Sequence, residues 1–464
     1  MSTVPLKSVG MHTWDVPRAE LGHSASVMFV AFVAILATFV FTMPVTESWK
    51  HSTYENYDNT IDDAEASVRE GTLSRQIALG GFALIGVAAL AWPGGKTLRV
   101  HNVLGAICVC YLAWCLATCL WSDDFSMSLR RWIALMCEVA AGVAIAKRTS
   151  ARQFVWFVFT CTLAWLGLGV LAELSLGTFR PLEEGHRFAG VFHPNVMGVN
   201  AALLTLASLY LAIAAGRRNW LLISVAALSF VFLLLTRSRT SLAAMLVAIA
   251  VFWIFTAPAS RKFFHTLLAG IAAACLTMAV GLGMFDISAN LITMGRADNE
   301  MSTFTGRVPL WQELLQEFVP QRPLVGHGYG AFWTADHIAE VSRSQDWVTT
   351  HAHSSYIDLV LNVGYIGAAL CATAMLLAAI AGLRREVRRA GAGYGFIAMI
   401  VVFGLTAGLT ETYIGLTWFL SFFGICGVCY LLFDGNGESI QPSPSSESPR
   451  PNRYPPRHRR KAIV

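Results

Sequence analysis

Long apolar runs constrain this chain more than any other feature of its sequence. There are about twelve, each close to the roughly 20 residues that cross the hydrocarbon core of a bilayer. Of the 464 residues, 55% are hydrophobic and only 14% are charged, whereas a soluble globular protein carries roughly 25% charged residues. We therefore predict an all-α, polytopic integral membrane protein, with spans at residues 24–43, 76–93, 100–121, 132–147, 153–173, 196–215, 220–236, 240–257, 264–284, 355–383, 394–410 and 415–433.

The polar segments divide the chain into three predicted parts. Residues 1–23 form a cytoplasmic N-terminal tail, and residues 24–433 form the transmembrane domain. No cleavable signal is evident, because the first run is long enough to remain as a span. Residues 434–464 are rich in Ser and Pro and then basic, so we expect a disordered cytoplasmic tail near anionic lipid.

Basic residues in the short linkers mark one end of the predicted bundle. By the positive-inside rule this end faces the cytoplasm, where twelve spans also place both termini. The basic residues concerned are Lys96, Arg99, Lys147, Arg148, Arg152, Arg217, Arg218, Arg261, Lys262, Arg384, Arg385, Arg388 and Arg389. The outer end then carries the segments 44–75, 122–131, 174–195 and 285–354.

Arginines also gather at the outer end, where positive charge is disfavoured. They are Arg130, Arg131, Arg180, Arg187, Arg237, Arg239, Arg296, Arg307, Arg322 and Arg343. The stretch TRSRT, with Arg237 and Arg239, separates two apolar runs with almost no loop, and charges so close to hydrocarbon indicate function. Guanidinium groups bind phosphate oxygens bidentately, which predicts a phosphate or diphosphate ligand. The alternatives are snorkelling to lipid phosphates and ion pairs with Glu183, Glu184, Asp286 or Asp298.

We predict that the long outer segment, residues 285–354, is the cap of an active site. It holds an amphipathic stretch flanked by tryptophan and three turn-forming glycines, Gly326, Gly328 and Gly330. It ends in a histidine pair just before the apolar run that starts near Tyr356. Pro194 and Asn195, in another outer segment, either leave helix amides facing an anion or simply start a helix.

The histidine pair, His351 and His353, points to proton transfer. A neutral imidazole accepts a proton from a hydroxyl nucleophile near pH 7. Two histidines that flank one alanine in an extended segment point to opposite faces, so we expect one of them to do the chemistry. The other orients, packs or faces solvent, and we expect His351 to lie in a mobile loop. A zinc site with His327, His337 and Asp336 is the alternative, although no HExxH or comparable spacing occurs.

All ten cysteines fall inside apolar runs, which argues against a disulfide framework in the polar loops. Cys108 and Cys110 are close enough to suggest a metal pair. Buried packing thiols are the favoured interpretation.

Four motifs resemble those of the O-antigen ligase and polymerase superfamily, in the same order along the chain. HSSYIDLVLNVGYIG, starting at His353, is similar to the superfamily's histidine signature. Upstream, RFAGVFHPNVMGVNAALL (187–204), TRSRTSLAA (236–244) and TGRVPLWQELLQEFVPQRPLVGHGYGAF (305–332) are similar to its other conserved segments. The resemblance covers about residues 180–370.

The resemblance implies a GT-C-like fold with a large periplasmic loop between spans 9 and 10, in the inner membrane of a bacterium. Members move a glycan from undecaprenyl diphosphate to a sugar hydroxyl at the periplasmic face, by metal-independent inverting transfer. By the motif match, His353 would be the base, and Arg187 and Arg239 would hold the diphosphate. Two residues depart from the commonest pattern: His351 is added, and Ser354 stands where asparagine is frequent.

The glycine-rich block favours a Wzy-type polymerase of exopolysaccharide or O-antigen. An O-antigen ligase acting on lipid A-core and, from a different class, a transporter or flippase of lipid-linked sugars remain alternatives. We expect no cofactor and no nucleic acid; the expected partners are the lipid-linked donor, a second lipid-linked unit or lipid A-core as acceptor, membrane lipids and a chain-length regulator. The residues expected to contact substrate are Arg237, Arg307, Asn195, His351, Tyr356, Trp311 and Gly328.

Overall fold

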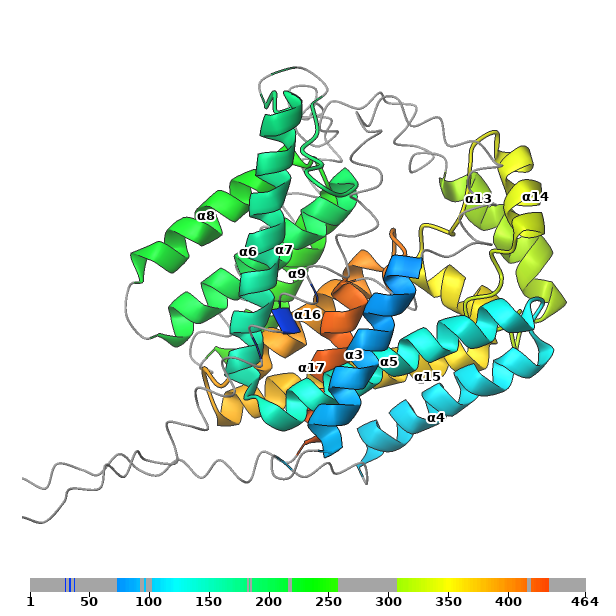
Figure 1. Ribbon diagram of the computed structural model, residues 1–464, viewed down its shortest axis with the longest axis horizontal. Coiled ribbons are helices and arrows are strands. Elements are labelled where there is room, and N and C mark those ends of the chain that lie inside the picture. Colours follow the sequence, from blue (N-terminus) through cyan, green and yellow to red (C-terminus); the bar gives the residue numbers. More distant parts are fainter. Residues whose placement is uncertain are drawn as a thin grey trace, which may run out of the picture.

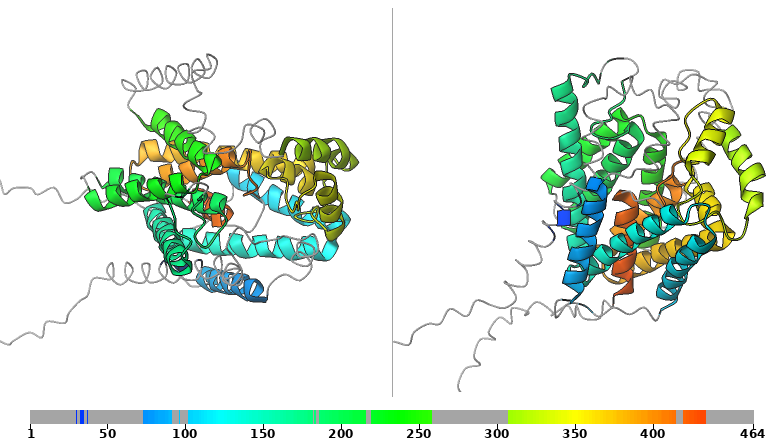
Figure 2. Two further views of the ribbon diagram at one scale, coloured as in Figure 1. Left: turned by 90° about the horizontal axis from the view of Figure 1, so that it is seen from above. Right: turned by 45° about the vertical axis from the view of Figure 1, so that its right-hand side comes forward.

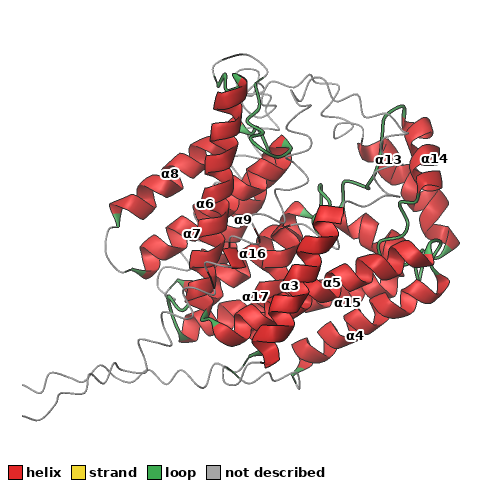
Figure 3. Cartoon of the chain, in the orientation of Figure 1, coloured by secondary structure: helices red, strands yellow, loops and turns green. Residues whose placement is uncertain are grey.

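The computed structural model describes most of the central part of the chain. The described residues are 73–91, 96, 102–181, 183, 186–215, 219–257, 307–414 and 419–433, with Val30, Val33, Ala34 and Ala37. Within them, every regular element is a helix (Figure 3). The predicted N-terminal and C-terminal tails lie outside the described residues.

A bundle of long helices forms the body of the molecule (Figure 1). Ten of the twelve predicted runs coincide with its helices, whereas run 264–284 lies outside the described residues and run 24–43 lies almost wholly outside them. The helices are α3 (Leu73–Ala91), α4 (Val103–Thr118) with the short η2 (Cys119–Trp121), α5 (Phe125–Arg148), α6 (Ala151–Leu176), α7 (Pro194–Ala214), α8 (Trp220–Leu235), α9 (Arg239–Thr256), α15 (Ser355–Arg388), α16 (Tyr394–Ala407) and α17 (Phe419–Leu432).

Hydropathy and exposure together indicate a multi-pass membrane protein, as predicted. Among the described residues, five helices are long and apolar enough to cross a membrane: α4 extended by η2, α6, α7, α9 and α15. Large apolar side chains such as Leu120, Leu221 and Leu84 point outward with 72% to 80% of their surface exposed, which suits contact with lipid rather than water. The total of twelve spans stays a prediction.

Helix α7 is the most buried of the five long apolar helices. Its most apolar window is 83% buried, compared with 22% to 56% for the other four. Nearby, α6 and α17 pack through aromatic rings, with the Trp165 ring tilted against that of Phe419 at 4.9 Å and Phe157 in edge contact with Phe423. Aromatic packing of this kind stabilises a core beyond the area that it buries. The residues at the end of α7 are therefore held on a rigid support.

Local capping decides where the helices begin. The Asp124 side chain accepts the amide of Met127, so α5 starts at Phe125. The predicted outer segment 122–131 is consequently mostly helix, and Arg130 and Arg131 belong to α5, which begins seven residues before the predicted span 132–147. An N-cap aspartate favours a helix over a loop because its side chain accepts a backbone amide that has no partner within the first turn.

The predicted basic residues gather at one end of the bundle, where the structure describes them. Lys96 Nζ donates to the carbonyl of Thr149 at 2.8 Å, and Arg385 Nη2 donates to that of Leu431 at 2.7 Å. Cations at helix C-termini offset the negative end of the helix dipole. Arg99, Arg217, Arg218, Arg261 and Lys262 lie outside the described residues.

The predicted cap is a folded unit at the opposite end of the bundle, described from residue 307 onward. It contains α13 (Arg307–Glu313), a π-helical turn η3 (Leu314–Phe318), a short η4 (Val319–Gln321) and α14 (Ala335–Gln345), which stand at one edge of the molecule (Figures 1 and 2). They enclose a small apolar core of their own, made of Leu310, Leu314, Phe318, Val319, Phe332, Trp333, Ile338, Val341, Ala352 and Leu361. The cap is thus not a simple polar loop.

The glycine-rich loop of the cap interrupts α15. Gly364 has φ 68° and ψ 179°, so the predicted span 355–383 is two helical pieces joined at a break. The amides of His327 and Gly328 donate to carbonyls that the break leaves open, those of Leu361 and Asn362, at 2.8 and 2.9 Å. Gly326, Gly328 and Gly330 all have positive φ, as their predicted role in turns requires.

Candidate active site

Several helices begin around one point beneath the cap. The N-termini of α7, α9, α13 and α15 meet the loop that follows α16, residues 408–414. Helix N-termini carry partial positive charge and favour an anion. Their convergence with arginines makes this place the candidate active site.

A chain of hydrogen bonds crosses the site from Arg187 to Arg307. Arg187 Nη2 donates to Oδ1 of Asn195 at 2.8 Å, and its Nε donates to the carbonyl of Thr236 at 3.1 Å. Nδ2 of Asn195 donates to Oε1 of Glu411 at 2.7 Å. The same Oε1 lies 2.8 Å from Nη2 of Arg307. One carboxylate therefore joins two of the predicted arginines.

Glu173 fixes the loop that carries Arg187. Its Oε1 accepts the amides of Ala189 and Gly190, both at 2.8 Å, from a buried position on α6. The loop then reaches Pro194, the first residue of α7, which confirms the predicted helix start. Asn195 follows directly, so the helix start and the loop together aim both polar side chains at the site.

Arg237 and Arg239 lie where α8 ends and α9 begins. Both are partly buried, and Arg237 adopts a left-handed backbone conformation with φ 51°. Ser238 caps α9, and Arg239 is its first residue. The next residue, Thr240, has its hydroxyl 2.8 Å from that of Thr410. The predicted TRSRT segment is thereby attached to the loop that holds Glu411.

Glu411 is held ionised. Its backbone is fixed because Ser355 donates to the Glu411 carbonyl through its amide at 3.2 Å and its hydroxyl at 2.9 Å. Burial by itself raises the pKa of the Glu411 carboxyl, but His353 and the Arg307 cation outweigh burial and lower the pKa to about 2 from the ordinary 4.5. The site thus contains a permanent negative charge among its arginines.

The two histidine rings contact each other at a tilt of 46°, which corrects the prediction that they point to opposite faces. The ring centroids of His351 and His353 are 4.0 Å apart. The prediction assumed an extended backbone, but His353 has φ 50°, and a left-handed residue breaks the alternation of a strand. Nδ1 of His353 lies 3.9 Å from Oε2 of Glu411, an ion-pair distance longer than a hydrogen bond.

The segment between the histidines is anchored, which corrects the expectation of a mobile loop around His351. The amide of Ala352 donates to the carboxylate of Asp358 at 3.1 Å, and Nε1 of Trp311 donates to the Ala352 carbonyl at 2.8 Å. Asp358 also accepts from Trp333 at 2.7 Å and from Thr412 at 2.5 Å. One buried carboxylate therefore ties together the cap, the histidine segment and the residue beside Glu411.

His351 is neutral at physiological pH, because burial, reinforced by the neighbouring His353, lowers its pKa to about 3. A further histidine, His193, lies exposed at the start of α7. Nδ1 of His193 accepts the amide of Asn195 at 3.2 Å, which caps α7.

The structure does not bring all the predicted substrate-binding residues to this point. Tyr356 donates its hydroxyl to the carbonyl of Leu405 at 2.7 Å and so joins α15 to α16. Gly328, with φ 108°, packs its backbone against Ser122 at the other side of the cap. Trp311 contacts the backbone between the two histidines through its hydrogen bond to Ala352.

The structure adds Glu411, Asp358 and His193 to the residues predicted from the sequence. A signal for Glu411 existed, since it is the only acidic residue between 387 and 433 and lies between two apolar runs. Charge so close to the hydrocarbon indicates function or pairing. Asp358 carried the same signal, because it lies one turn into an apolar run.

The residues of the zinc alternative have other partners. Nδ1 of His327 lies 2.7 Å from Asp123, and Nδ1 of His337 lies 2.7 Å from the carbonyl of Phe332. In the part of the chain that the structure describes, no group of three or more His, Cys, Asp or Glu side chains could hold a metal ion. Cys110 is exposed on α4, where we expected a buried thiol, because it faces outward like the apolar residues around it.

Two comparisons relate this chain to known proteins. Residues 224–372 match the family model described as O-Antigen ligase, a stretch that includes Arg237, Arg239, Arg307 and both histidines. The chain is 29% identical over 295 residues to the exopolysaccharide production protein ExoQ of Rhizobium meliloti (strain 1021), across 58% of this chain and 63% of that protein. The chain therefore spans less than two thirds of the length of this relative. These matches confirm the predicted resemblance to the superfamily of O-antigen ligases and polymerases.

Proposed function

We propose that this chain is a bacterial inner-membrane glycosyltransferase that polymerises exopolysaccharide repeat units at the periplasmic face. The donor is a glycan on undecaprenyl diphosphate, and the acceptor is a sugar hydroxyl on a second lipid-linked unit. The observation that carries the proposal is the cluster in which Glu411 lies between His353 and the arginines Arg187 and Arg307. A general base, its counter-charge and phosphate-binding groups would lie together in this cluster.

His353 is the base in the proposed reaction. Because Nδ1 faces Glu411, we assign Nε2 as the nitrogen that accepts the proton of the acceptor hydroxyl. The ionised Glu411 stabilises the imidazolium that forms, and catalytic contacts that are long in the free enzyme often shorten once substrate is bound. His351 stays neutral, so it packs against His353 without adding a competing positive charge.

The reaction is a single displacement. The acceptor oxygen forms a bond to the anomeric carbon of the donor as its proton moves to His353. The bond from that carbon to the diphosphate oxygen breaks, and undecaprenyl diphosphate leaves with the electron pair. The configuration at the anomeric carbon is inverted.

The arginines stabilise the leaving group. Arg187 is held at two points, by Thr236 and Asn195, so its guanidinium is oriented before substrate arrives. Arg239 begins α9, where the helix dipole adds to its charge. Donors fixed in this way stabilise developing negative charge more in the transition state than in the ground state.

The relative ExoQ is named an exopolysaccharide production protein, and this supports polymerisation. The family model is described as O-Antigen ligase, and this favours a second candidate, transfer to lipid A-core. The two reactions use the same donor chemistry and differ in the acceptor.

Reconstitution separates the two candidates. The purified full chain is incubated with a lipid-linked repeat unit, with and without lipid A-core, and the glycan length is measured. We expect lengthened lipid-linked glycan without lipid A-core, and none with His353→Ala. Product only on lipid A-core supports the ligase, and no product in either reaction contradicts both.

A further inference from the structure

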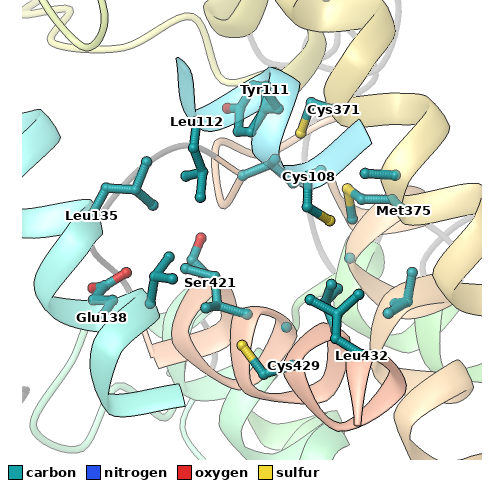
Figure 4. Close-up of a pocket in the computed structure, with 18 of the residues that line it drawn as sticks. Cys108, Tyr111, Leu112, Leu135, Glu138, Cys371, Met375, Ser421, Cys429 and Leu432 are labelled. Carbon is teal, nitrogen blue, oxygen red and sulfur yellow. The ribbon is translucent and has the colours of Figure 1, made fainter. Parts of the chain in front are cut away.

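A cavity lies in the bundle beside the candidate active site. It has a volume of about 300 Å³ and lies between α4, α5, α15, α16 and α17. Its walls are mainly aliphatic and sulfur-containing side chains, including Leu112, Leu135, Met375 and Leu432, with the carboxyl group of Glu138 at one side (Figure 4). A cavity with such walls accepts an apolar ligand.

The cavity is elongated. The residues of α17 that line it recur every turn, at 420 and 421, 424 and 425, 428 and 429, and 432. Twelve residues of helix rise by roughly 18 Å, so the cavity follows most of this helix. A ligand of this shape is a chain rather than a compact ring.

One end of the cavity adjoins a smaller pocket. Tyr329 and Ile414 line the cavity and also line this smaller pocket, which has a volume of about 70 Å³. The smaller pocket has polar side chains among its walls, including His351, Thr350 and Asp358. A ligand chain in the large cavity would therefore have its polar head beside His351.

The cavity does not involve the arginines assigned to the donor. Neither Arg187 nor Arg239 lines the cavity or the smaller pocket, and the arginine that lines the smaller pocket is Arg131. A donor diphosphate held by Arg187 and Arg239 would therefore lie outside both. A lipid chain in the cavity would then belong to the other substrate.

We propose, on the basis of the proposed function, that this cavity binds the isoprenoid chain of the lipid-linked acceptor. The cavity then sets the position of the acceptor hydroxyl relative to His353. A site for a second isoprenoid chain is what a polymerase requires, because both of its substrates are lipid-linked. A ligase would require the acyl chains of lipid A instead.

Two glycines that line the cavity can be replaced by larger residues in order to fill it. A side chain on Gly424 meets no atom within 4 Å of its Cβ, and one on Gly404 meets only Met375, at 3.7 Å. Gly424→Leu and Gly404→Leu should therefore fill the space without disturbing the backbone. Gly167→Leu is the matched control, since Gly167 is an exposed helical glycine on α6, also has open space at its Cβ, and does not line the cavity.

The experiment is photolabelling of the purified full chain with undecaprenyl phosphate that carries a diazirine on its isoprenoid chain. We expect label on peptides of α4 and α17, about tenfold weaker labelling in both cavity-filling variants, and unchanged labelling in Gly167→Leu. Each variant is first shown to be monodisperse with an unchanged melting temperature. His353→Ala should keep the label although it loses transfer, so a failed base assignment is distinguishable from a failed cavity assignment.

Competition with unlabelled lipids identifies the kind of lipid chain that the cavity binds. Unlabelled undecaprenyl phosphate should displace the probe, whereas lipid A and phosphatidylethanolamine should not. Displacement by lipid A alone would overturn the assignment in favour of acyl chains. Labelling only outside α4 and α17, labelling displaced by any phospholipid, or full labelling of these two helices in both cavity-filling variants would overturn a specific lipid site in this cavity.

Discussion

Asn195 and Glu411 are joined by a hydrogen bond of 2.7 Å between side chains 216 residues apart in the sequence. The bond links the start of α7, the most buried of the long apolar helices, to the loop that follows α16. Asn195 also accepts from Arg187, so its side-chain amide connects the Glu411 carboxylate to the Arg187 guanidinium. Glu411 is therefore the residue on which both halves of the site depend.

Glu411→Gln should lower transfer by about 10²–10³-fold, because the imidazolium of His353 loses its counter-charge in the transition state. Glutamine keeps the size and can still accept from Asn195 and Arg307. Binding of the lipid donor should change little. The measurement is kcat and KM in reconstituted membranes, and a variant with normal kcat would contradict the role of the charge.

The lowered pKa of the Glu411 carboxyl predicts that the stability of the protein depends on pH. The folded-state pKa of Glu411, about 2, lies below the ordinary 4.5, so ionisation favours the folded state above pH 4.5. This contribution should be lost as the pH falls from about 4.5 towards 2. Thermal melting of the wild-type chain and of Glu411→Gln at pH 6 and pH 3.5 tests it; the difference between the two proteins should shrink at the lower pH.

His353→Ala should reduce transfer by about 10²–10⁴-fold, the usual contribution of a general base. His351→Ala should lose far less, because the proton is assigned to His353 and the His351 ring lies beside it, with centroids 4.0 Å apart. Complementation of a deletion strain, with membrane levels matched by immunoblot, compares the two. Equal loss in both variants would mean that the rings act as one unit, and inhibition by a chelator, reversed by zinc, would indicate a metal reaction.

Arg187→Lys should impair transfer by about 10²–10³-fold although it keeps the charge. Lysine cannot donate to Thr236 and Asn195 and also present a planar fork to a diphosphate. Arg239→Lys should behave similarly. Arg180→Lys is the control, since Arg180 is exposed and pairs with Glu183. Wild-type turnover and donor affinity in Arg187→Ala and Arg239→Ala would contradict the assignment.

Gly364→Ala should destabilise the protein by about 1–3 kcal/mol or more, because only glycine adopts this backbone conformation readily. A Cβ at this position would also collide with the backbone of Leu324 and Val325. Gly80→Ala on α3 is the control, with open space at its Cβ and a helical backbone. Thermal melting in detergent should show a lower melting temperature for the first variant only.

Labelling tests the orientation in the membrane. Glu340 lies exposed on α14 of the cap, and Ala390 lies exposed at the basic end of the bundle. In intact spheroplasts, a membrane-impermeant maleimide should label Glu340→Cys and should label Ala390→Cys only after lysis. The parent chain sets the background, and the reverse pattern would place the site in the cytoplasm.

The amino-acid sequence by itself determined the helices, the two ends of the bundle and most of the cations of the site. Hydropathy specifies a span locally, since each run meets the bilayer on its own. Pro194 and the glycines at 326, 328 and 330 likewise act through their own backbone preferences. Arg187 and Arg307 were found because cations near hydrocarbon stand out in any sequence.

Only the tertiary structure decided how these pieces meet. His353 turns towards His351 because its φ of 50° is imposed by neighbours, among them Asp358, which holds the amide of Ala352. The break at Gly364 exists because a loop some 40 residues earlier supplies the amides that satisfy it. Glu411 joins Asn195 through a contact that spans 216 residues. Such contacts depend on the packing of whole helices, which no local pattern of residues contains.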